Sequence, residues 1–280
     1  MHDNRIFVAM EYEIKPHEKL SLGIKELWQY RELFFFFTWR DIKVKYKQTF
    51  FGFAWAVFQP LLLMVVFTVF FGKGQQPEGL PYPVFAISGL ILWNIFSTGL
   101  TGAGNSMVTN ANIIKKIYFP RLIIPISAVL VSLFDFIMAF IIFIVILIYY
   151  HVHISFCWFP VMIITGIIIT SIATFGVGSL LAALNVKYRD FRYVIPFMIQ
   201  AMLFLTPVIY PVSKISIGWI KYILAINPMY SAIELFRYGF NGGQELQTDL
   251  ICISIGSSFL FFVIGLYYFR KTEVYFADIA

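Results

Sequence analysis

Residues 122–150 read LIIPISAVLVSLFDFIMAFIIFIVILIYY, an apolar run with a single charged residue, Asp135. About 20 apolar residues are enough for a helix to cross the hydrocarbon core of a bilayer, so this run can span a membrane, tilted or extending beyond the core. The run lacks the alternation of apolar and polar residues that marks a barrel strand. Because lipid satisfies no backbone hydrogen bonds, the run predicts a transmembrane helix.

Similar apolar runs occur on both sides of this one. The run at 54–71 is almost purely hydrocarbon, whereas the run at 84–104 is rich in Gly, Ser and Thr. The six predicted spans are 54–71, 84–104, 122–150, 159–184, 194–210 and 250–269. We therefore expect an all-α integral membrane protein with six transmembrane helices, a cytoplasmic N-terminal segment at 1–50 and a transmembrane domain at 51–280.

The composition of the 280 residues supports this fold class. Sixty per cent of the residues are apolar and 13% are charged, and the mean hydropathy is +0.79. So few polar groups could not cover the surface of a soluble protein. The net charge of +6 comes from basic residues at the ends of apolar runs. Membrane topology and anionic lipid headgroups explain that placement better than nucleic acid does.

The distribution of Lys and Arg predicts the orientation. If the N-terminus lies in the cytoplasm, 17 of the 21 Lys and Arg residues fall in cytoplasmic segments. The other four, Lys73, Lys214, Lys221 and Arg237, then fall outside. The positive-inside rule therefore predicts a multi-pass membrane protein with both termini in the cytoplasm. The first 50 residues mix charges of both signs, unlike a cleavable signal peptide.

Residues 19–37 predict an amphipathic helix before the first span. Leu20, Ile24, Leu27 and Trp28 recur at helical spacing, and the stretch becomes wholly apolar at 34–37. This pattern is typical of a helix lying in the cytoplasmic membrane interface. A soluble helix packed on a partner is the alternative.

The segment at 211–248 is not an ordinary loop. Apolar stretches at 219–226 and 233–240 flank Asn227-Pro228, and each stretch is too short to cross a membrane. Short apolar helices separated by Asn and Pro indicate a pair of re-entrant helices that dip in from the outside.

A basic stretch, WRDIKVKYK at 39–47, precedes the first span. Its apolar–basic alternation also fits a strand, so periodicity alone is ambiguous here. In a helix, Arg40, Lys43 and Lys47 would share one face and could hold a phosphate at the cytoplasmic surface. Attraction to lipid headgroups and a role in setting topology are the alternatives.

The loop at 105–121 carries apolar residues where water is expected. Ile113, Ile114, Ile117, Tyr118 and Phe119 would be exposed in a plain loop. A short apolar helix on the cytoplasmic side indicates docking into a groove on a partner protein, with packing on the membrane surface as the alternative.

The sequence contains no recognisable catalytic motif. It has no GxxxxGK[ST], HExxH or GxSxG pattern, and the two cysteines, Cys157 and Cys252, are isolated. His151 and His153 are predicted to lie in an interfacial turn without a third metal ligand. Asp135 is a possible intramembrane polar site. No Lys or Arg in the spans could pair with it, so we expect a structural carboxylate, protonated or hydrogen-bonded to a neighbouring helix.

Three stretches, together and in this order, resemble the permease subunits of the ABC-2 type transporter family. The similar branch exports O-antigen, capsular polysaccharide and teichoic acid. The stretches are RDIKVKYKQT at 40–49 with GFAW at 52–55 and Gln59-Pro60, then NANIIKKIYFPR at 110–121, and finally YRDFR at 188–192 with TPVIYP at 206–211 and Asn227-Pro228-Met229.

This resemblance implies a homodimer paired with two copies of a cytoplasmic P-loop ATPase. The permease would bind no cofactor, because the ATPase would hold ATP and Mg²⁺. The coupling helix to that ATPase would comprise Asn112, Ile113, Ile114, Lys115, Lys116 and Tyr118. Arg40, Lys43 and Lys47 would lie at the entrance for a polyprenyl-pyrophosphate-linked glycan.

Three other functions compete with polysaccharide export. A permease of the same superfamily could export a small lipid or drug. A stand-alone secondary transporter should contain several ion-coupling carboxylates, and Asp135 alone supports that function poorly. A membrane-embedded enzyme should show a catalytic constellation, and the sequence contains none that we recognise.

Overall fold

The computed structural model describes residues 24–47, 52, 54–75, 77, 79–152, 154, 158–240, 246–273 and 276. No strand occurs among these residues, which confirms the all-α prediction. The helices in chain order are α1 (Ile24–Gln29), α2 (Arg31–Lys47), α3 (Ala54–Phe71), α4 (Tyr82–Thr109), α5 (Ala111–Ile114), α6 (Ile123–Tyr149), α7 (Trp158–Lys187), α8 (Phe191–Leu205), α9 (Gly218–Ala225), α10 (Met229–Tyr238) and α11 (Thr248–Glu273), with a 3₁₀ turn, η1 (Val212–Lys214), before α9.

Five helices in the described ranges are long and apolar enough to cross a membrane: α3, α4, α6, α7 and α11. They coincide with five of the six predicted spans to within a few residues. The span predicted at 194–210 is instead the 15-residue helix α8, which is about 22 Å long against a core of about 30 Å. Thr206 is extended, as the residue before a proline prefers, and it ends the helix ahead of Pro207. A sixth crossing therefore stays a prediction.

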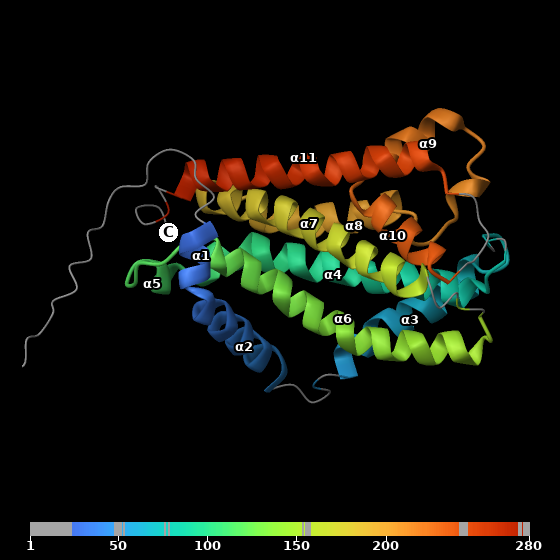
Figure 1. Ribbon diagram of the computed structural model, residues 1–280, viewed down its shortest axis with the longest axis horizontal. Helices are drawn as coiled ribbons and strands as arrows, with labels where there is room; N and C mark the ends of the chain where they lie inside the picture. The colour runs from blue at the N-terminus through green and yellow to red at the C-terminus, as the bar shows by residue number, and fades with distance from the viewer. Residues whose placement is uncertain are drawn as a thin grey trace, which may run out of the picture.

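The long helices form an elongated bundle (Figure 1). α1, α5 and the C-terminal end of α11 lie at one end of the bundle, and α9 and α10 lie toward the other end. This arrangement is the one expected if the N-terminal segment, the 105–121 loop and the C-terminal segment share one side of the membrane.

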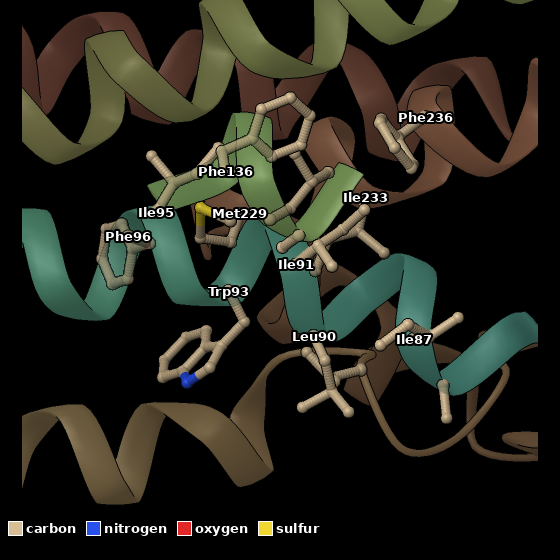
Figure 2. Packing of buried hydrophobic residues seen from close by; sticks show 14 of the residues in the cluster. Ile87, Leu90, Ile91, Trp93, Ile95, Phe96, Phe136, Met229, Ile233 and Phe236 are labelled. Carbon is tan, nitrogen blue, oxygen red and sulfur yellow. The ribbon is translucent and has the colours of Figure 1, made fainter. Parts of the chain in front are cut away.

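α4 is the central helix, packed mainly against α6 and α7. Ile87, Ile91 and Ile95 of α4 are buried with Phe136 of α6 and Ile233 of α10 (Figure 2). Small residues allow this close packing: a Cβ at Gly99 would lie 2.6 Å from the Thr174 side chain. The Gly, Ser and Thr content that lowers the hydropathy of this span thus belongs to a helix that faces protein on most sides.

The N-terminal region differs from the single amphipathic helix predicted at 19–37. Residues 19–23 lie outside the described residues. α1 ends at Gln29, Tyr30 forms a turn, and α2 begins at Arg31. The basic stretch, ambiguous by periodicity, is the helical second half of α2. α2 packs along α6 and buries Phe37, Ile42 and Tyr46. The N-terminal helices are therefore part of the bundle and not a detached segment.

Two short helices occupy the region where a re-entrant pair is predicted. They are α9 and α10, and Asn227-Pro228 lies between them as expected. The Asn227 side-chain oxygen accepts a hydrogen bond of 3.0 Å from the Met229 amide, at the start of α10. α10 is largely buried against α7, α11 and α4, whereas α9 exposes Trp219 and Ile223. Their insertion into the membrane stays a prediction.

Candidate functional site

The predicted basic face exists on α2. Arg40, Lys43 and Lys47 line one cavity of about 380 Å³ together with Phe36, Trp39 and Val44. The Lys43 ammonium lies 5.2 Å from the centre of the Trp39 ring, a cation–π distance. Lys43 and Lys47 are exposed, so this cavity presents two accessible cations beside aromatic surface.

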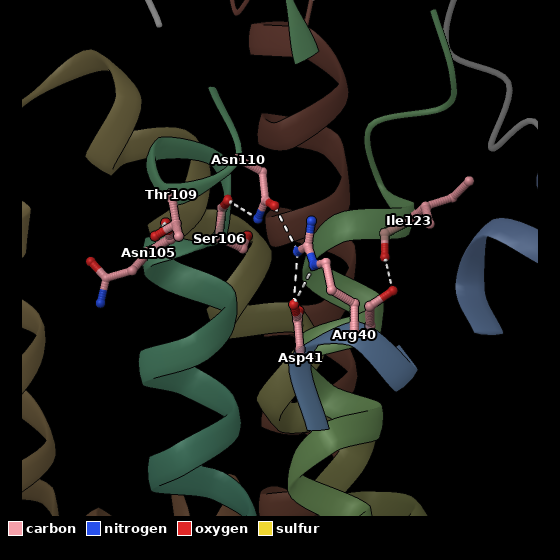
Figure 3. A network of polar contacts seen from close by, with 8 residues as sticks. Arg40, Asp41, Asn105, Ser106, Thr109, Asn110 and Ile123 are labelled. Carbon is pink, nitrogen blue, oxygen red and sulfur yellow. Dashed lines mark hydrogen bonds and ion pairs between the residues drawn. The ribbon is translucent and has the colours of Figure 1, made fainter. Parts of the chain in front are cut away.

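Arg40 is fixed in position by two neighbours. Its guanidinium donates hydrogen bonds to Asp41 Oδ1 at 2.8 Å and to Asn110 Oδ1 at 2.7 Å (Figure 3). The guanidinium also lies 4.8 Å from the centre of the Phe37 ring. Because Asn110 directly follows α4, Arg40 connects α2 to the end of the central helix. The sequence offered no signal for this contact, which joins residues 70 positions apart.

Asp135 has a basic partner, contrary to the expectation that it would have none. Lys45 Nζ and Tyr46 Oη both donate hydrogen bonds to the Asp135 carboxylate. The prediction considered only the spans, whereas Lys45 belongs to α2, which lies alongside α6. Asp135 is 1% exposed. A buried carboxylate held by a cation and a phenol fits a structural role, with hydrogen bonds to a neighbouring helix as predicted.

A second cavity, of about 410 Å³, lies between α2, α4 and α6. It shares Arg40 and Val44 with the basic cavity. Most of its lining residues are polar, and they come from all three helices: Arg40, Asp41, Val44, Lys45, Thr98, Thr101, Gly102, Asn105, Ser106, Thr109, Asn110, Ala128, Val131, Ser132 and Asp135. The sequence did not predict this cavity, because it depends on which helices are neighbours.

The loop after α4 is less exposed than predicted. α5 is a single helical turn, and Ile114 and Phe119 are buried against their own chain, with the Phe119 ring 5.6 Å from that of Phe37. Ile113 packs against the same cluster. Ile114 and Phe119 are therefore not exposed as they would be in a plain loop, and Ile113 is partly buried, because these side chains anchor the loop. The residues left on the outer surface are Asn112, Lys115, Lys116, Ile117 and Tyr118.

The Tyr118 phenol lies in an acidic environment. Partial burial, followed by the charges of Glu26 and Glu273, raises the pKa of Tyr118 above its usual value. Arg121 connects the same loop to the end of α11, where its side chain donates to the Glu273 carbonyl oxygen.

Comparison with known proteins identifies the family. The ABC-2 type transporter family matches residues 32–241, which run from α2 to just beyond α10.

This chain belongs to the ABC-2 type transporter family.

Similar proteins include two O-antigen export system permease proteins RfbA of Klebsiella pneumoniae. They are 31% and 32% identical over 243 residues, which cover 86% of this chain and 92% of each relative. The O-antigen export system permease protein RfbA of Myxococcus xanthus is 29% identical over 221 residues, 76% of this chain and 82% of that relative. The resemblance to polysaccharide-export permeases is confirmed at the level of the family, which is one of transporter permeases and not of enzymes.

A further charged residue of this ABC-2 permease, Arg237, is buried within the bundle, which the sequence did not predict. The Arg237 guanidinium on α10 is 4% exposed and donates to Ser88 Oγ and to three backbone carbonyl oxygens. Those carbonyls belong to Phe85, Pro207 and Val208, at 2.7–3.1 Å. Its charge also lies 3.5 Å from the centre of the Phe85 ring. Arg237 therefore ties α10 to α4 and to the irregular segment after α8.

Among the described residues, no group of three His, Cys, Asp or Glu side chains lies close enough to hold a metal ion, and the absence of a metal site stays a prediction. His151 lies in the turn after α6, with a left-handed backbone (φ 51°), and its location at the membrane interface stays a prediction. His153 and Cys157 lie outside the described residues.

Proposed function

We propose that this ABC-2 permease is the membrane subunit of an ATP-driven exporter that moves a lipid-linked polysaccharide, of the O-antigen type, from the cytoplasmic side across the bacterial inner membrane. The observation that carries the proposal is the basic cavity on α2, in a chain whose relatives are named O-antigen export permeases. The lipid-linked glycan that we propose as cargo is anionic at its pyrophosphate, and this cavity offers Lys43 and Lys47 to that charge.

The basic cavity suits a pyrophosphate next to a lipid. Two exposed ammonium groups attract phosphate as point charges, and the Arg40 guanidinium can present several donors at once. Phe36 and Trp39, also in the lining, can accommodate the apolar carrier chain beside the charged group. Polyprenyl pyrophosphate carries both kinds of group.

The proposed assembly is a homodimer of this chain with two copies of a cytoplasmic P-loop ATPase. The resemblance of residues 110–121 to a coupling helix supports this assembly. The exposed residues Lys115, Lys116, Ile117 and Tyr118 combine charge with apolar surface, as a docking site requires. The ATPase would bind ATP and Mg²⁺, and this chain would bind neither.

The proposed topology places both termini in the cytoplasm. The common location of α1, α5 and the C-terminal end of α11 at one end of the bundle supports it (Figure 1). The basic cavity on α2 would then open near the cytoplasmic surface, where a lipid-linked glycan is accessible before export.

A stand-alone secondary transporter is the alternative function, and the contacts of Asp135 speak against it. A coupling carboxylate must gain and lose a proton or an ion during transport. Asp135 instead accepts hydrogen bonds from Lys45 and Tyr46 on a neighbouring helix. A permease for a small lipid or drug is the second alternative. An anionic lipid headgroup could also use the two lysines, so the relatives named O-antigen export permeases are what favour the glycan.

Replacing the gene with a Lys43→Ala/Lys47→Ala variant tests the proposed function in cells. We expect the variant to insert into the membrane in normal amounts, to leave surface polysaccharide strongly reduced, and to accumulate lipid-linked glycan inside. The matched control is Lys73→Ala, which removes an exposed lysine after α3. Normal surface polysaccharide in the double variant would contradict the proposed entrance.

A further inference from the structure

The cavity between α2, α4 and α6 adjoins the basic cavity but differs from it in chemistry. Arg40 and Val44 belong to both linings, so the two cavities adjoin each other along α2. The second cavity follows α4 from Asn110 back to Thr98, a distance of about 18 Å along a helix. A ligand whose charged group occupies the basic cavity would therefore place its next chemical group here.

The α4 wall of this cavity consists of hydrogen-bond acceptors. The hydroxyls of Thr98, Thr101 and Thr109 each donate to the carbonyl oxygen four residues earlier, at 2.6, 2.7 and 3.0 Å respectively. Each hydroxyl hydrogen is therefore committed to its own helix, while the oxygen keeps lone pairs toward the cavity. Three acceptors in line along one helix match a ligand that carries several hydroxyl donors.

The opposite wall supplies donors with little net charge. The Lys45 ammonium has three hydrogens, and its positive charge is balanced by Asp135. Arg40 is balanced by Asp41 in the same way, with 2.7 Å between the charged atoms. The cavity thus offers donors and acceptors around paired charges, in contrast to the exposed lysines on the other face of α2. Val44, Ala128 and Val131 add apolar surface beside these polar groups. A sugar ring, which has both hydroxyls and apolar C–H faces, matches this mixed lining better than a phosphate does.

We propose that this cavity binds the first sugar of the lipid-linked glycan while the basic cavity holds the pyrophosphate. The proposal rests on the proposed function, since it places the sugar of the same ligand. A volume of about 410 Å³ falls in the range of small-molecule sites. Thr101 and Thr109 recognise the sugar hydroxyls, and Arg40, which borders both cavities, lies at the junction between phosphate and sugar.

Ligand binding to the full chain, purified with any co-purifying ATPase in lipid nanodiscs, tests the proposal. The probes are polyprenyl pyrophosphate with no sugar and the same lipid carrying one hexose. The key variant is Thr101→Val/Thr109→Val, which removes two exposed hydroxyls that bond only to their own helix. The matched control is Thr165→Val on α7, whose hydroxyl makes the same kind of bond at 2.8 Å to the Val161 carbonyl.

We expect the unmodified chain and Thr165→Val to bind the hexose-carrying lipid about tenfold more tightly than the bare lipid, the effect of one or two hydrogen bonds. In Thr101→Val/Thr109→Val this preference should disappear while affinity for the bare lipid is unchanged. If the double variant keeps the full preference, the sugar does not bind in this cavity, although the basic cavity can still hold the pyrophosphate. If Lys43→Ala/Lys47→Ala leaves the affinity for the bare lipid unchanged, the proposed entrance itself is wrong.

Discussion

Lys45 of α2 donates a hydrogen bond to the carboxylate of Asp135, and this ion pair joins the N-terminal helix to the middle of α6. Tyr46, the next residue, donates to the other carboxylate oxygen. The pair fixes α2 against the bundle and closes one side of the polar cavity. The placement of the basic face thus depends on an electrostatic contact between two residues that lie 90 positions apart in the chain.

Removing Lys45 should destabilise the protein more than removing both charges does. Lys45→Ala leaves Asp135 buried without its cation, which should cost about 3 kcal/mol. The loss should be at the low end of the usual range, because the Lys45 side chain is 40% exposed. Thermal unfolding in detergent measures the effect. In Lys45→Ala/Asp135→Ala much of the stability should return, and strictly additive losses would show that the two charges do not interact.

A side chain at Gly265 should separate α7 from α11. A Cβ at Gly265 would lie 1.9 Å from the Gly176 carbonyl oxygen, so even Gly265→Ala forces the two helices apart. We expect a clear fall in the unfolding temperature. Gly256→Ala, on the same helix, meets no atom within 4 Å and should be neutral or stabilising by up to about 1 kcal/mol. Equal effects of the two substitutions would argue against this close packing.

Lysine at position 237 should not preserve the stability that Arg237 provides. A single ammonium cannot reach the four acceptors that surround the guanidinium, so Arg237→Lys leaves buried carbonyl groups unsatisfied and should cost about 3 kcal/mol. Glu234, 3.5 Å from Arg237 and 24% exposed, is the control. Glu234→Gln should have a smaller effect on the unfolding temperature. An Arg237→Lys variant as stable as the unmodified chain would show that the charge alone suffices.

Substitutions in the loop after α4 should separate docking from folding. Lys115→Glu/Lys116→Glu changes two exposed residues and should reduce co-purification of the ATPase while the yield of folded permease stays normal. Ile114→Asp places a carboxylate in a site that is 6% exposed and should lower the yield itself. Lys73→Glu, just after the C-terminal end of α3, should change neither ATPase recovery nor the yield of folded permease. Full ATPase recovery with the first variant would remove these lysines from the interface.

The sequence was sufficient where local pattern determines the structure. Apolar length located α3, α4, α6, α7 and α11, and the spacing of Arg40, Lys43 and Lys47 correctly predicted a shared face. The length of α8 was overestimated, because apolar character continues past Leu205 while the proline at position 207 stops the helix.

Contacts between distant segments could not be predicted. The partner of Asp135 is a lysine in a segment that was treated as separate from the spans. The burial of Arg237 could not be predicted, because the sequence gives no sign that its acceptors lie on α4 and in the segment after α8. The burial of Ile114 likewise depends on Phe37 and Leu122, which belong to the same cluster. Periodicity records which face of a helix is apolar, but not which neighbour covers it.

Transport in proteoliposomes tests the central claim most directly. The permease, reconstituted with its co-purifying ATPase, is supplied with a labelled polyprenyl-pyrophosphate-linked glycan on the ATPase side. The proposed function predicts that the glycan becomes accessible on the opposite side only when ATP is added, and that Lys43→Ala/Lys47→Ala abolishes this transfer. Transfer that is driven by a proton gradient without ATP would contradict the proposed function and indicate a secondary transporter instead.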